Sequence, residues 1–430
     1  MNKYMKYYIG IDTGTTSISI AAVNEEKELI TSRTVNHSSF MSGENPESRV
    51  QNPERITRIV LDTLDGIISE LGQPSAIGFT GQMHGMMYVS VFGSPVSPLY
   101  TWQDTTGNDS VNLLHEHGLH VSPGYGLATH YHLQRAGKIP GDAVKMTTIS
   151  DYIAMKLCGN SEPVLSSDMA ASWGCFDLEA RHFNYYGLDE AGVDTSYLPN
   201  VVNGYKVIGQ TPEGVPVVCS MGDNQASVKG AVQDEGNFVL VNVGTGSQVS
   251  FITREYYDTE GSIEIRPYGD IYLLAGSSLC GGRAYAMLEK FYRDIAGHEY
   301  FSAMQEQAEA FLQSHGLDEA WDVTTTFMGT RSDPAKKGSI TGISEGNFCA
   351  GAFTVGVIQG ILRELHEMYE AMTALTGRNA NILVGSGNGM RKNALMQRLA
   401  GDMFGMGVNI PAFTEEAACG AALCAMECVK

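Results

Sequence analysis

The chain has 430 residues, of which 43% are hydrophobic and 18% charged, a composition that excludes a disordered protein and suits roughly two or three domains. Acidic residues outnumber basic ones by 48 to 28, and the net charge of -20 argues against nucleic acid or an anionic membrane as a partner. The sequence shows neither a signal peptide nor an apolar run of membrane-spanning length, and its eight cysteines form no CxxC pair. We therefore expect a cytoplasmic protein with reduced cysteines and no zinc site.

A strand, a tight turn and a second strand are predicted over residues 8–23 (YIGIDTGTTSISIAAV), with Asp12 at the end of the first strand. A similar unit recurs at residues 238–252 (FVLVNVGTGSQVSFI). Glycine lets a backbone approach phosphate closely, and the N–H groups and hydroxyls of such turns can point at its oxygens. Asp12 could hold a metal ion beside that phosphate. Either unit alone could be an ordinary turn, but the pair indicates two halves built on one plan, facing each other across a cleft.

The first half alternates helices and strands. Asn52 as N-cap and Pro53 as the first helical residue begin an amphipathic helix that ends near Gly72. Residues 76–80 read as a buried strand, residues 81–85 (GQMHG) as a turn, and residues 86–91 as a further strand. A helix between strands predicts an α/β layered architecture.

The middle of the chain is less regular. Five histidines between positions 115 and 132 could mark a metal site, but their spacing fits no common ligand pattern and favours surface or pocket histidines. Residues 166–177 are rich in small and polar side chains and predict a loop that leads into a short strand. A strand at residues 215–219 runs towards Gly222 and Asp223, and a helix is expected over residues 225–232.

The second half is predicted to begin near residues 232–237. Beyond the second hairpin, the pattern predicts the following elements in chain order: a long amphipathic helix through residues 355–372, a strand at 381–384, a Gly-rich loop at 385–389 (GSGNG), a helix at about 393–404, a strand at 407–410 and a final helix after Thr414.

Two of these features have alternative interpretations. Asp223 could be a helix N-cap, or a carboxylate that accepts the proton of an attacking hydroxyl, as in phosphoryl transfer. The Gly385 loop has room for a base or a phosphate. It also resembles a dinucleotide fingerprint, but its third glycine comes one residue too early for GxGxxG, and a dehydrogenase would leave the two hairpins unexplained.

Taken together, the segments resemble the FGGY family of carbohydrate kinases over essentially the whole chain. Beside the hairpins and Gly222–Gln225, five further segments carry the resemblance in the family's order: Gly81–Gly85, Tyr100–Asp104 (YTWQD), Ser167–Gly174 (SDMAASWG), Gly385–Asn393 and Glu415–Ala422. The resemblance implies an α/β, duplicated actin-like ATPase (ribonuclease H-like) fold with two domains around a central cleft. It implies an N-terminal domain over residues 1–235 with the sugar pocket, the first phosphate loop and the catalytic Asp. A C-terminal domain over residues 236–430 would carry the second phosphate loop and the adenosine site.

The resemblance also implies roles for individual residues. Asp223 would be the general base, and Asp12 and Asp223 would lie on the Mg²⁺ side. The phosphate loops would be formed by Thr15, Thr16, Gly244, Thr245 and Gly246. The sugar pocket would be formed by Gln82, Met83, His84, Trp102, Asp104, Asn224 and Gln225, with plain core packing as the alternative for Met83 and Trp102. The adenosine site would be lined by Gly387, Asn388 and Asn393.

The family resemblance predicts ATP and Mg²⁺ as cofactors and a small-molecule sugar as substrate, with no nucleic acid and no membrane partner, and it is compatible with a homodimer. Within the family, the motif wording is most similar to kinases of the ketose sedoheptulose, with xylulose kinases next. Many members carry Lys or Arg shortly after the first Gly-Thr turn, where this chain has Ser17-Ile18-Ser19. Two rivals remain: a non-catalytic actin-like sugar sensor, which would not need Asp223, and an actin-like chaperone or filament protein, which would lack the sugar pocket.

Overall fold

The computed structural model describes residues 6–43, 48–232, 237–259, 261–330, 333 and 335–430. The chain divides into two compact units: Met1–Gln233 with Arg266–Ile271 and Phe413–Lys430, and Asp234–Ile265 with Tyr272–Ala412. The two predicted domains are each continuous in sequence, whereas these units are not. Two later segments, the hairpin tip Arg266–Ile271 and the C-terminal segment Phe413–Lys430, belong to the first unit. The predicted boundary at 235/236 lies outside the described residues.

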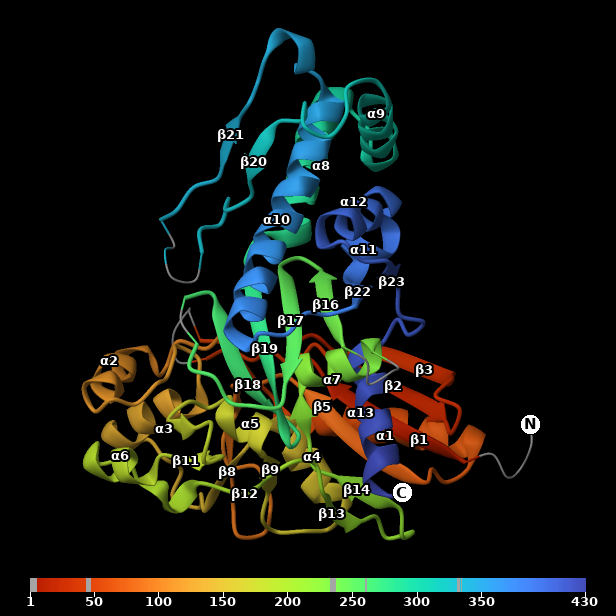
Figure 1. Cartoon of the computed structure of the whole chain (residues 1–430). Coiled ribbons are helices and arrows are strands. Elements are labelled where there is room, and N and C mark those ends of the chain that lie inside the picture. The colour runs from red at the N-terminus through yellow and green to blue at the C-terminus, as the bar shows by residue number, and fades with distance from the viewer. Residues whose placement is uncertain (1–5, 44–47, 233–236, 260, 331–332, 334) are drawn as a thin grey trace. The chain divides into compact units, whose positions relative to one another are not determined.

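The first unit is built on a mixed sheet of order β13-β14-β5-β1-β2-β3, with β15 also paired to β5 (Figure 1). Strands β1 and β2 form the predicted hairpin, β2 pairs antiparallel with β3, and β5 pairs in parallel with both β1 and β14. The strands are β1 (Tyr7–Thr13), β2 (Ser17–Asn24), β3 (Leu29–Asn36), β5 (Ala76–Gly81), β13 (Val207–Gln210), β14 (Pro216–Val218) and β15 (Met221–Gly222).

Alternating side chains of β1 separate two hydrophobic cores. Ile9 and Ile11 belong to one core, with α1 (Pro53–Leu71) and α4 (Ile149–Leu157). Tyr8 belongs to the opposite core, with α7 (Asp223–Ala231) and α13 (Glu416–Cys428).

Close approach of α13 to the sheet and to α7 requires glycine. A Cβ on Gly10 would lie 1.8 Å from the Ala418 carbonyl oxygen, and one on Gly420 would lie 1.9 Å from that of Ala226. These contacts explain why the final helix belongs to the first unit.

Most residues between β5 and β13, together with the short strand β4 (Val50–Gln51), form a further layer with its own core around the buried Trp173. Its helices are α2 (Asn108–Glu116), α3 (Gly126–Arg135), α5 (Ser167–Ala171), α6 (Tyr185–Glu190) and the 3₁₀ turn η1 (Thr195–Tyr197). Its short strand pairs are β4 (Val50–Gln51) with β7 (Leu99–Tyr100), β6 (Met87–Val89) with β8 (Lys145–Thr147), β9 (Val164–Ser166) with β12 (Asn200–Val202), and β10 (Phe176–Asp177) with β11 (His182–Phe183).

The prediction of a loop over residues 166–177 is therefore wrong for its first part. Ser166 caps α5 by accepting a hydrogen bond from the Met169 N–H at 3.4 Å, and this cap allows a short helix among small residues. The short strand predicted after it is present as β10.

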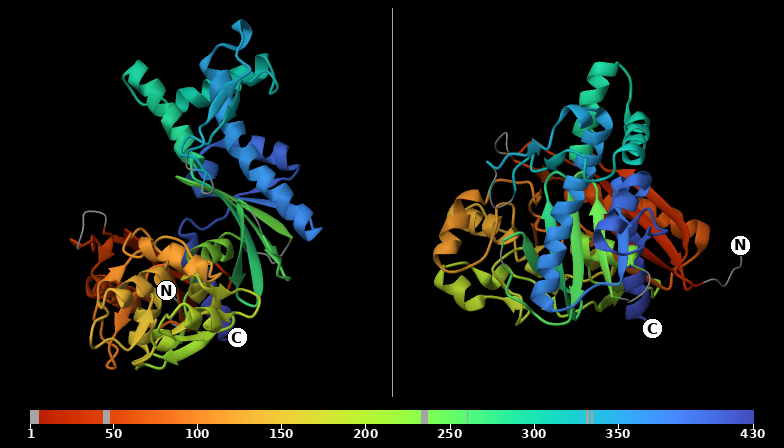
Figure 2. Two further views of the ribbon diagram at one scale, coloured as in Figure 1. Left: turned by 90° about the vertical axis from the view of Figure 1, so that its left-hand side faces the viewer. Right: turned by 45° about the horizontal axis from the view of Figure 1, so that its top comes forward.

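The second unit contains a sheet of order β18-β19-β17-β16-β22-β23. The strands are β16 (Phe238–Val243), β17 (Ser247–Thr253), β18 (Ile263–Tyr268), β19 (Ile271–Ser278), β22 (Ile382–Ser386) and β23 (Val408–Asn409), with a separate hairpin of β20 (Asp322–Thr324) and β21 (Ser339–Thr341). The helices are α8 (Gly281–Ala296), α9 (Phe301–Ser314), α10 (Ala350–Thr376), α11 (Gly387–Lys392), α12 (Ala394–Phe404) and the 3₁₀ turn η2 (Glu345–Asn347). Figure 2 shows α10 along this sheet, where it packs on β17.

The two sheets repeat one plan. In the first unit, β3-β2-β1-β5-β14 reads antiparallel, antiparallel, parallel, parallel along the order. In the second unit, β19-β17-β16-β22-β23 reads the same way. This duplication confirms the prediction, made from the two Gly-Thr hairpins, that the two halves are built on one plan.

The later elements follow the predicted order, with one correction. Strand β22 continues to Ser386 and α11 starts at Gly387, so the predicted Gly-rich loop is a direct passage from strand to helix. Gly387 has φ 77°, and a Cβ there would lie 2.6 Å from the Val243 carbonyl oxygen, so glycine permits this passage beside β16. Among the described residues, no helix is long and apolar enough to cross a membrane.

Candidate active site

Strand β5 brings the two predicted carboxylates to one edge of the first sheet. It pairs in parallel with β1, where Thr80 lies opposite Asp12, and with β15, where Gly81 lies opposite Gly222. Asp223 follows Gly222 directly as the first residue of α7. Since the carboxyl ends of parallel strands share one edge of a sheet, Asp12 and Asp223 come close together.

The surroundings of this pair disfavour two negative charges. Burial raises the pKa of Asp12 to about 7, and the charges of Asp223 and Glu415 contribute to the rise. Loss of hydration also raises the pKa of Asp223, although the residue reaches solvent, while the Arg266 guanidinium acts in the opposite direction. Nowhere in the described chain do three or more His, Cys, Asp or Glu side chains gather so as to hold a metal by themselves.

The first Gly-Thr turn is held through its carbonyl groups. His37 Nε2 lies 3.1 Å from the Gly14 oxygen, and the His37 backbone N–H donates to the Thr16 oxygen at 3.2 Å. Gln51 Nε2 donates to the Thr15 oxygen at 2.7 Å. These contacts fix the turn, in which Thr15 is partly exposed and Thr16 fully exposed.

Gln82 is buried directly after β5. Its backbone N–H donates to the Thr13 oxygen at 3.1 Å, and its side-chain Nε2 donates to Gln51 Oε1 at 3.0 Å. Its Oε1 is buried and has no hydrogen-bond partner. Gln82 is therefore tied to the phosphate turn through Gln51 and keeps one acceptor unused.

Met83 and His84 continue this segment. Met83 is 6% exposed and packs in the Trp173 core, as its core-packing interpretation predicts. His84 adopts φ 71°, uncommon for a residue with a Cβ. Its Nδ1 lies 2.6 Å from the Ser172 oxygen, and its ring stacks on Tyr125 with centroids 4.3 Å apart.

Trp102 and Asp104 lie close in sequence but differ in exposure, because Trp102 is exposed and Asp104 is buried. Trp102 is 46% exposed, which does not fit the core-packing alternative, and its Nε1 donates to Thr15 Oγ1 at 3.0 Å. Asp104 is buried, and its two oxygens accept the backbone N–H groups of Arg49 at 2.7 Å and Thr106 at 2.9 Å. In this structure Asp104 stabilises its own loop.

Asn224 and Gln225 contact the tip of the β18–β19 hairpin, residues 266–271, which belongs to the first unit. Gln225 is buried, and its Nε2 donates to the Pro267 oxygen at 2.9 Å. Asn224 Oδ1 accepts from Arg266 at 3.4 Å. Arg266 thus brings a positive charge beside Asp223, although no basic residue follows the first turn.

Asp168 was not predicted as a site residue, yet it connects these parts. It is buried on α5, and its Oδ2 accepts from the Tyr205 hydroxyl at 2.7 Å and from the Gly222 N–H at 3.3 Å. The Tyr205 oxygen in turn accepts from the Gly269 N–H at 3.2 Å. Burial raises the pKa of Asp168 to about 7. Asp168 therefore ties the residue before Asp223 to the hairpin tip.

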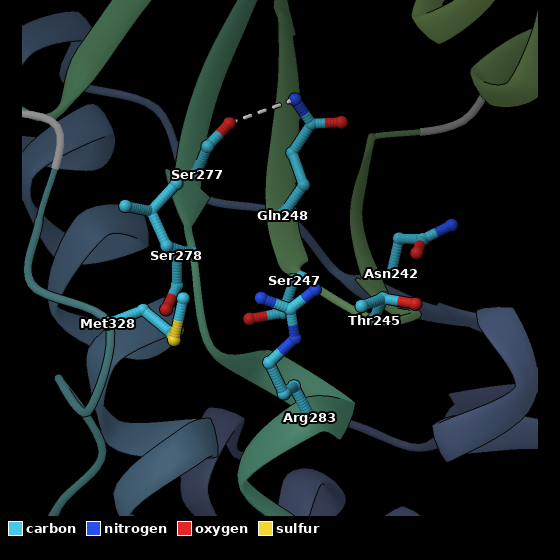
Figure 3. Close-up of a pocket in the computed structure, with 10 residues that line it drawn as sticks. Asn242, Thr245, Ser247, Gln248, Ser277, Ser278, Arg283 and Met328 are labelled. Atoms are coloured by element: carbon cyan, nitrogen blue, oxygen red, sulfur yellow. Dashed lines mark hydrogen bonds between the residues drawn. The ribbon is translucent and has the colours of Figure 1, made fainter. Parts of the chain in front are cut away.

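The second Gly-Thr turn borders a pocket of about 450 Å³ within the second unit (Figure 3). The N-terminus of α8 packs on this turn, since the Gly282 N–H donates to the Gly244 oxygen at 2.8 Å and the Arg283 N–H to the Thr245 oxygen at 3.0 Å. Figure 3 shows the Arg283 side chain extending from α8 towards the turn. The pocket is lined by Asn242, Thr245, Gly246, Ser247, Gln248, Ser277, Ser278, Leu279, Arg283 and Met328. The hydroxyl groups and the arginine in this lining are suited to an anion.

The predicted adenosine residues lie beyond this lining. Gly387 and the exposed Asn388 begin α11. Asn393 is buried and caps α12 by accepting the Met396 N–H at 3.0 Å. Asn242 joins the two regions, because its Nδ2 donates to Ser386 Oγ at 2.8 Å.

The duplicated sheets, each with a Gly-Thr turn between its first two strands, define an actin-like two-domain α/β fold. Residues 7–230 match the N-terminal domain of the FGGY family of carbohydrate kinases, and residues 239–427 match its C-terminal domain. The chain belongs to this family and is a carbohydrate kinase.

Individual relatives agree with this assignment. A sedoheptulokinase from Mus musculus is 28% identical over 91% of this chain and 91% of its own length. A xylulose kinase from Staphylococcus xylosus is 25% identical over 98% of this chain and 90% of its own. Among solved structures, a xylulose kinase from Rhodospirillum rubrum superposes with a TM-score of 0.85 at 18% identity, covering 98% of this chain and 89% of that one.

Proposed function

We propose that the protein transfers the γ-phosphate of ATP to a primary hydroxyl of a ketose, with Asp223 as general base. The observation that carries the proposal is the meeting of Asp12 and Asp223 at one edge of the first sheet, with the pKa of both raised. Asp223 would accept the hydroxyl proton while the oxygen attacks the γ-phosphorus, and the bond to the β-phosphate oxygen would break to release ADP.

Mg²⁺ fits the acidic side of this site. It prefers hard oxygen ligands and commonly takes one or two carboxylates together with substrate phosphates and water. Asp12 and Asp223 supply such a pair. Burial is the main cause of the raised pKa of Asp12, and a cation would offset the negative charges of Asp223 and Glu415 that add to it. When bound, the ion would neutralise the phosphate charge that develops during transfer.

Phosphate binding is assigned to both Gly-Thr turns. Thr15 and Thr16 offer hydroxyls in the first unit, whereas Thr245 and the Arg283 side chain offer donors in the second. The nucleotide base is assigned to Gly387, Asn388 and Asn393, next to the Asn242–Ser386 contact. The sugar is assigned to the first unit, near Gln82, His84, Trp102 and Asn224.

Sedoheptulose, phosphorylated at C7, is the proposed substrate, and xylulose is the alternative. The support is the identity to sedoheptulokinase, 28%, against 25% for xylulose kinase. Asp104 and Gln225 are proposed to support the sugar pocket indirectly rather than to contact the sugar. Asp104 accepts hydrogen bonds from backbone N–H groups, and Gln225 donates one to the hairpin tip.

A coupled assay of ADP release tests this proposal. It compares kcat/KM for D-sedoheptulose, D-xylulose, L-xylulose, L-ribulose and glycerol under one set of conditions. We expect D-sedoheptulose to lead. A lead of about tenfold for D-xylulose or glycerol, about 1.4 kcal/mol in transition-state binding, would refute the sugar assignment. If none of the five compounds stimulated ADP release, the proposal that ketoses or polyols accept the phosphate would be contradicted.

A further inference from the structure

A chain of hydrogen bonds runs from the first phosphate turn to the predicted sugar pocket through Gln51. This residue is fully buried on the two-residue strand β4. Its Nε2 donates to the Thr15 carbonyl oxygen at 2.7 Å, and its Oε1 accepts from Gln82 Nε2 at 3.0 Å. The chain therefore has three members, of which only Thr15 and Gln82 lie in recognised motifs.

The direction of this chain is fixed by its first member. A backbone carbonyl can only accept, so the nitrogen of the Gln51 amide must face Thr15 and its oxygen must face Gln82. The Gln82 amide must then point its nitrogen at Gln51 and its oxygen away. That oxygen is the buried Oε1 without a partner. A buried acceptor left unpaired costs free energy, which a ligand that donates a hydrogen bond would recover.

A second hydrogen bond reaches the same turn and also has a fixed direction. The indole N–H of Trp102 can only donate, so Thr15 Oγ1 is the acceptor in their 3.0 Å contact. The hydroxyl hydrogen of Thr15 then remains available for another acceptor. Phosphate oxygens are acceptors, so the orientation imposed by Trp102 is the one that phosphate binding requires.

We propose that Gln51 is a positioning residue that couples the sugar site to the phosphate turn, and that Gln82 Oε1 receives a hydroxyl of the sugar. This inference rests on the proposed function and adds a chemical requirement to it. The sugar group at Gln82 must be a hydroxyl donor, because the carbonyl of a ketose can only accept. A sugar hydroxyl on Gln82 completes the chain to Thr15, so sugar and nucleotide should strengthen each other's binding by the same factor.

Equilibrium binding measures this coupling directly. The dissociation constant of D-sedoheptulose, or of the ketose that leads the panel, is determined by calorimetry with and without a non-hydrolysable ATP analogue and Mg²⁺. We expect the analogue to tighten sugar binding of the unchanged protein within the usual span of roughly 5- to 150-fold. In Gln51→Met the analogue should change the dissociation constant of the sugar by no more than about twofold, although each ligand still binds alone.

Two further variants separate coupling from damage to the fold. Gln103→Met is the matched control, because Gln103 is exposed in the same segment as Trp102, and it should keep the full factor. Gln82→Met breaks the same chain at its sugar end, so it should lower the factor even if Gln51→Met does not fold.

The outcomes are distinguishable. Sugar binding with no coupling in the unchanged protein, or with full coupling in Gln51→Met or, where that variant does not fold, in Gln82→Met, would overturn the role of Gln51 and leave the kinase assignment intact. Absence of any ketose binding would overturn both. For the hydroxyl at Gln82, one monodeoxy ketose should lose about 10²-fold or more in kcat/KM with the unchanged protein and much less with Gln82→Met. Equal losses for every deoxy ketose in both proteins would refute that assignment.

Discussion

Replacing Asp12 by Asn should make the protein more stable at pH 8 and leave its stability nearly unchanged at pH 4. The pKa of Asp12 is raised from 3.8 to about 7 in the folded chain. The folded state therefore binds a proton at this group more tightly than the unfolded state does, and stability falls as the pH rises from about 4 to about 7. Asn carries no charge and removes this loss.

The magnitude follows from the shift. About three pKa units correspond to at most about 4 kcal/mol above pH 7, and relaxation around a partly exposed side chain reduces this. We expect a gain of roughly 1–3 kcal/mol at pH 8, which raises the midpoint of thermal unfolding by several degrees for a unit of this size.

Scanning calorimetry of the two proteins at pH 4.5, 6 and 8 tests this expectation, with Asp62→Asn on the exposed face of α1 as control. Because Asp151 and Asp168 also have a raised pKa, only the difference between proteins at each pH isolates Asp12. Mg²⁺ with an ATP analogue should narrow the gap by stabilising only the unchanged protein. A gap that is absent at pH 8, or equally large at pH 4.5, would refute the reasoning.

Two further predictions concern residues that the sequence did not predict as site residues. Arg283→Met should raise the KM for ATP about tenfold or more, the usual effect of losing a charge-assisted hydrogen bond, and leave the KM for sugar unchanged. Steady-state kinetics measure both constants, with Lys290→Met on the same helix as the control. Equal KM values for ATP in the two variants would contradict this prediction. Asp168→Ala should lower the free energy of unfolding by roughly 2–4 kcal/mol, because the Tyr205 hydroxyl and the Gly222 N–H lose their acceptor, whereas Asp168→Asn keeps an acceptor and should cost less. Urea unfolding measures both, and equal losses would argue against the hydrogen bonds as the cause.

Much of the fold was predictable because its signals are local. The Gly-Thr hairpins, the Asn52–Pro53 helix start and the order of the later elements all depend on short-range patterns that the structure reproduces. The helix α5 was missed although Ser166 and Asp168 are good capping residues, because five residues are too few to show a helical period.

Site residues could be predicted where a sequence motif contains them, but not where only the fold brings them to the site. Asp12 lies near the end of β1, Thr15 and Asp223 follow strands, and all three could be found from sequence. Gln51 and Arg266 could not, because a two-residue strand and a hairpin tip carry no motif and reach the site only through the fold. The sequence also could not reveal that Gln225 holds the Pro267 backbone, since that depends on which residues lie opposite.

The central claim is that Asp223 removes the proton from the sugar hydroxyl during phosphoryl transfer. The most direct test is the kcat of Asp223→Asn with the ketose that leads the panel, together with the affinity for a nucleotide analogue. We expect kcat to fall by roughly 10²–10⁴, the usual span for loss of a general base, while nucleotide binding stays near normal. An unchanged kcat in a folded Asp223→Asn protein would contradict it.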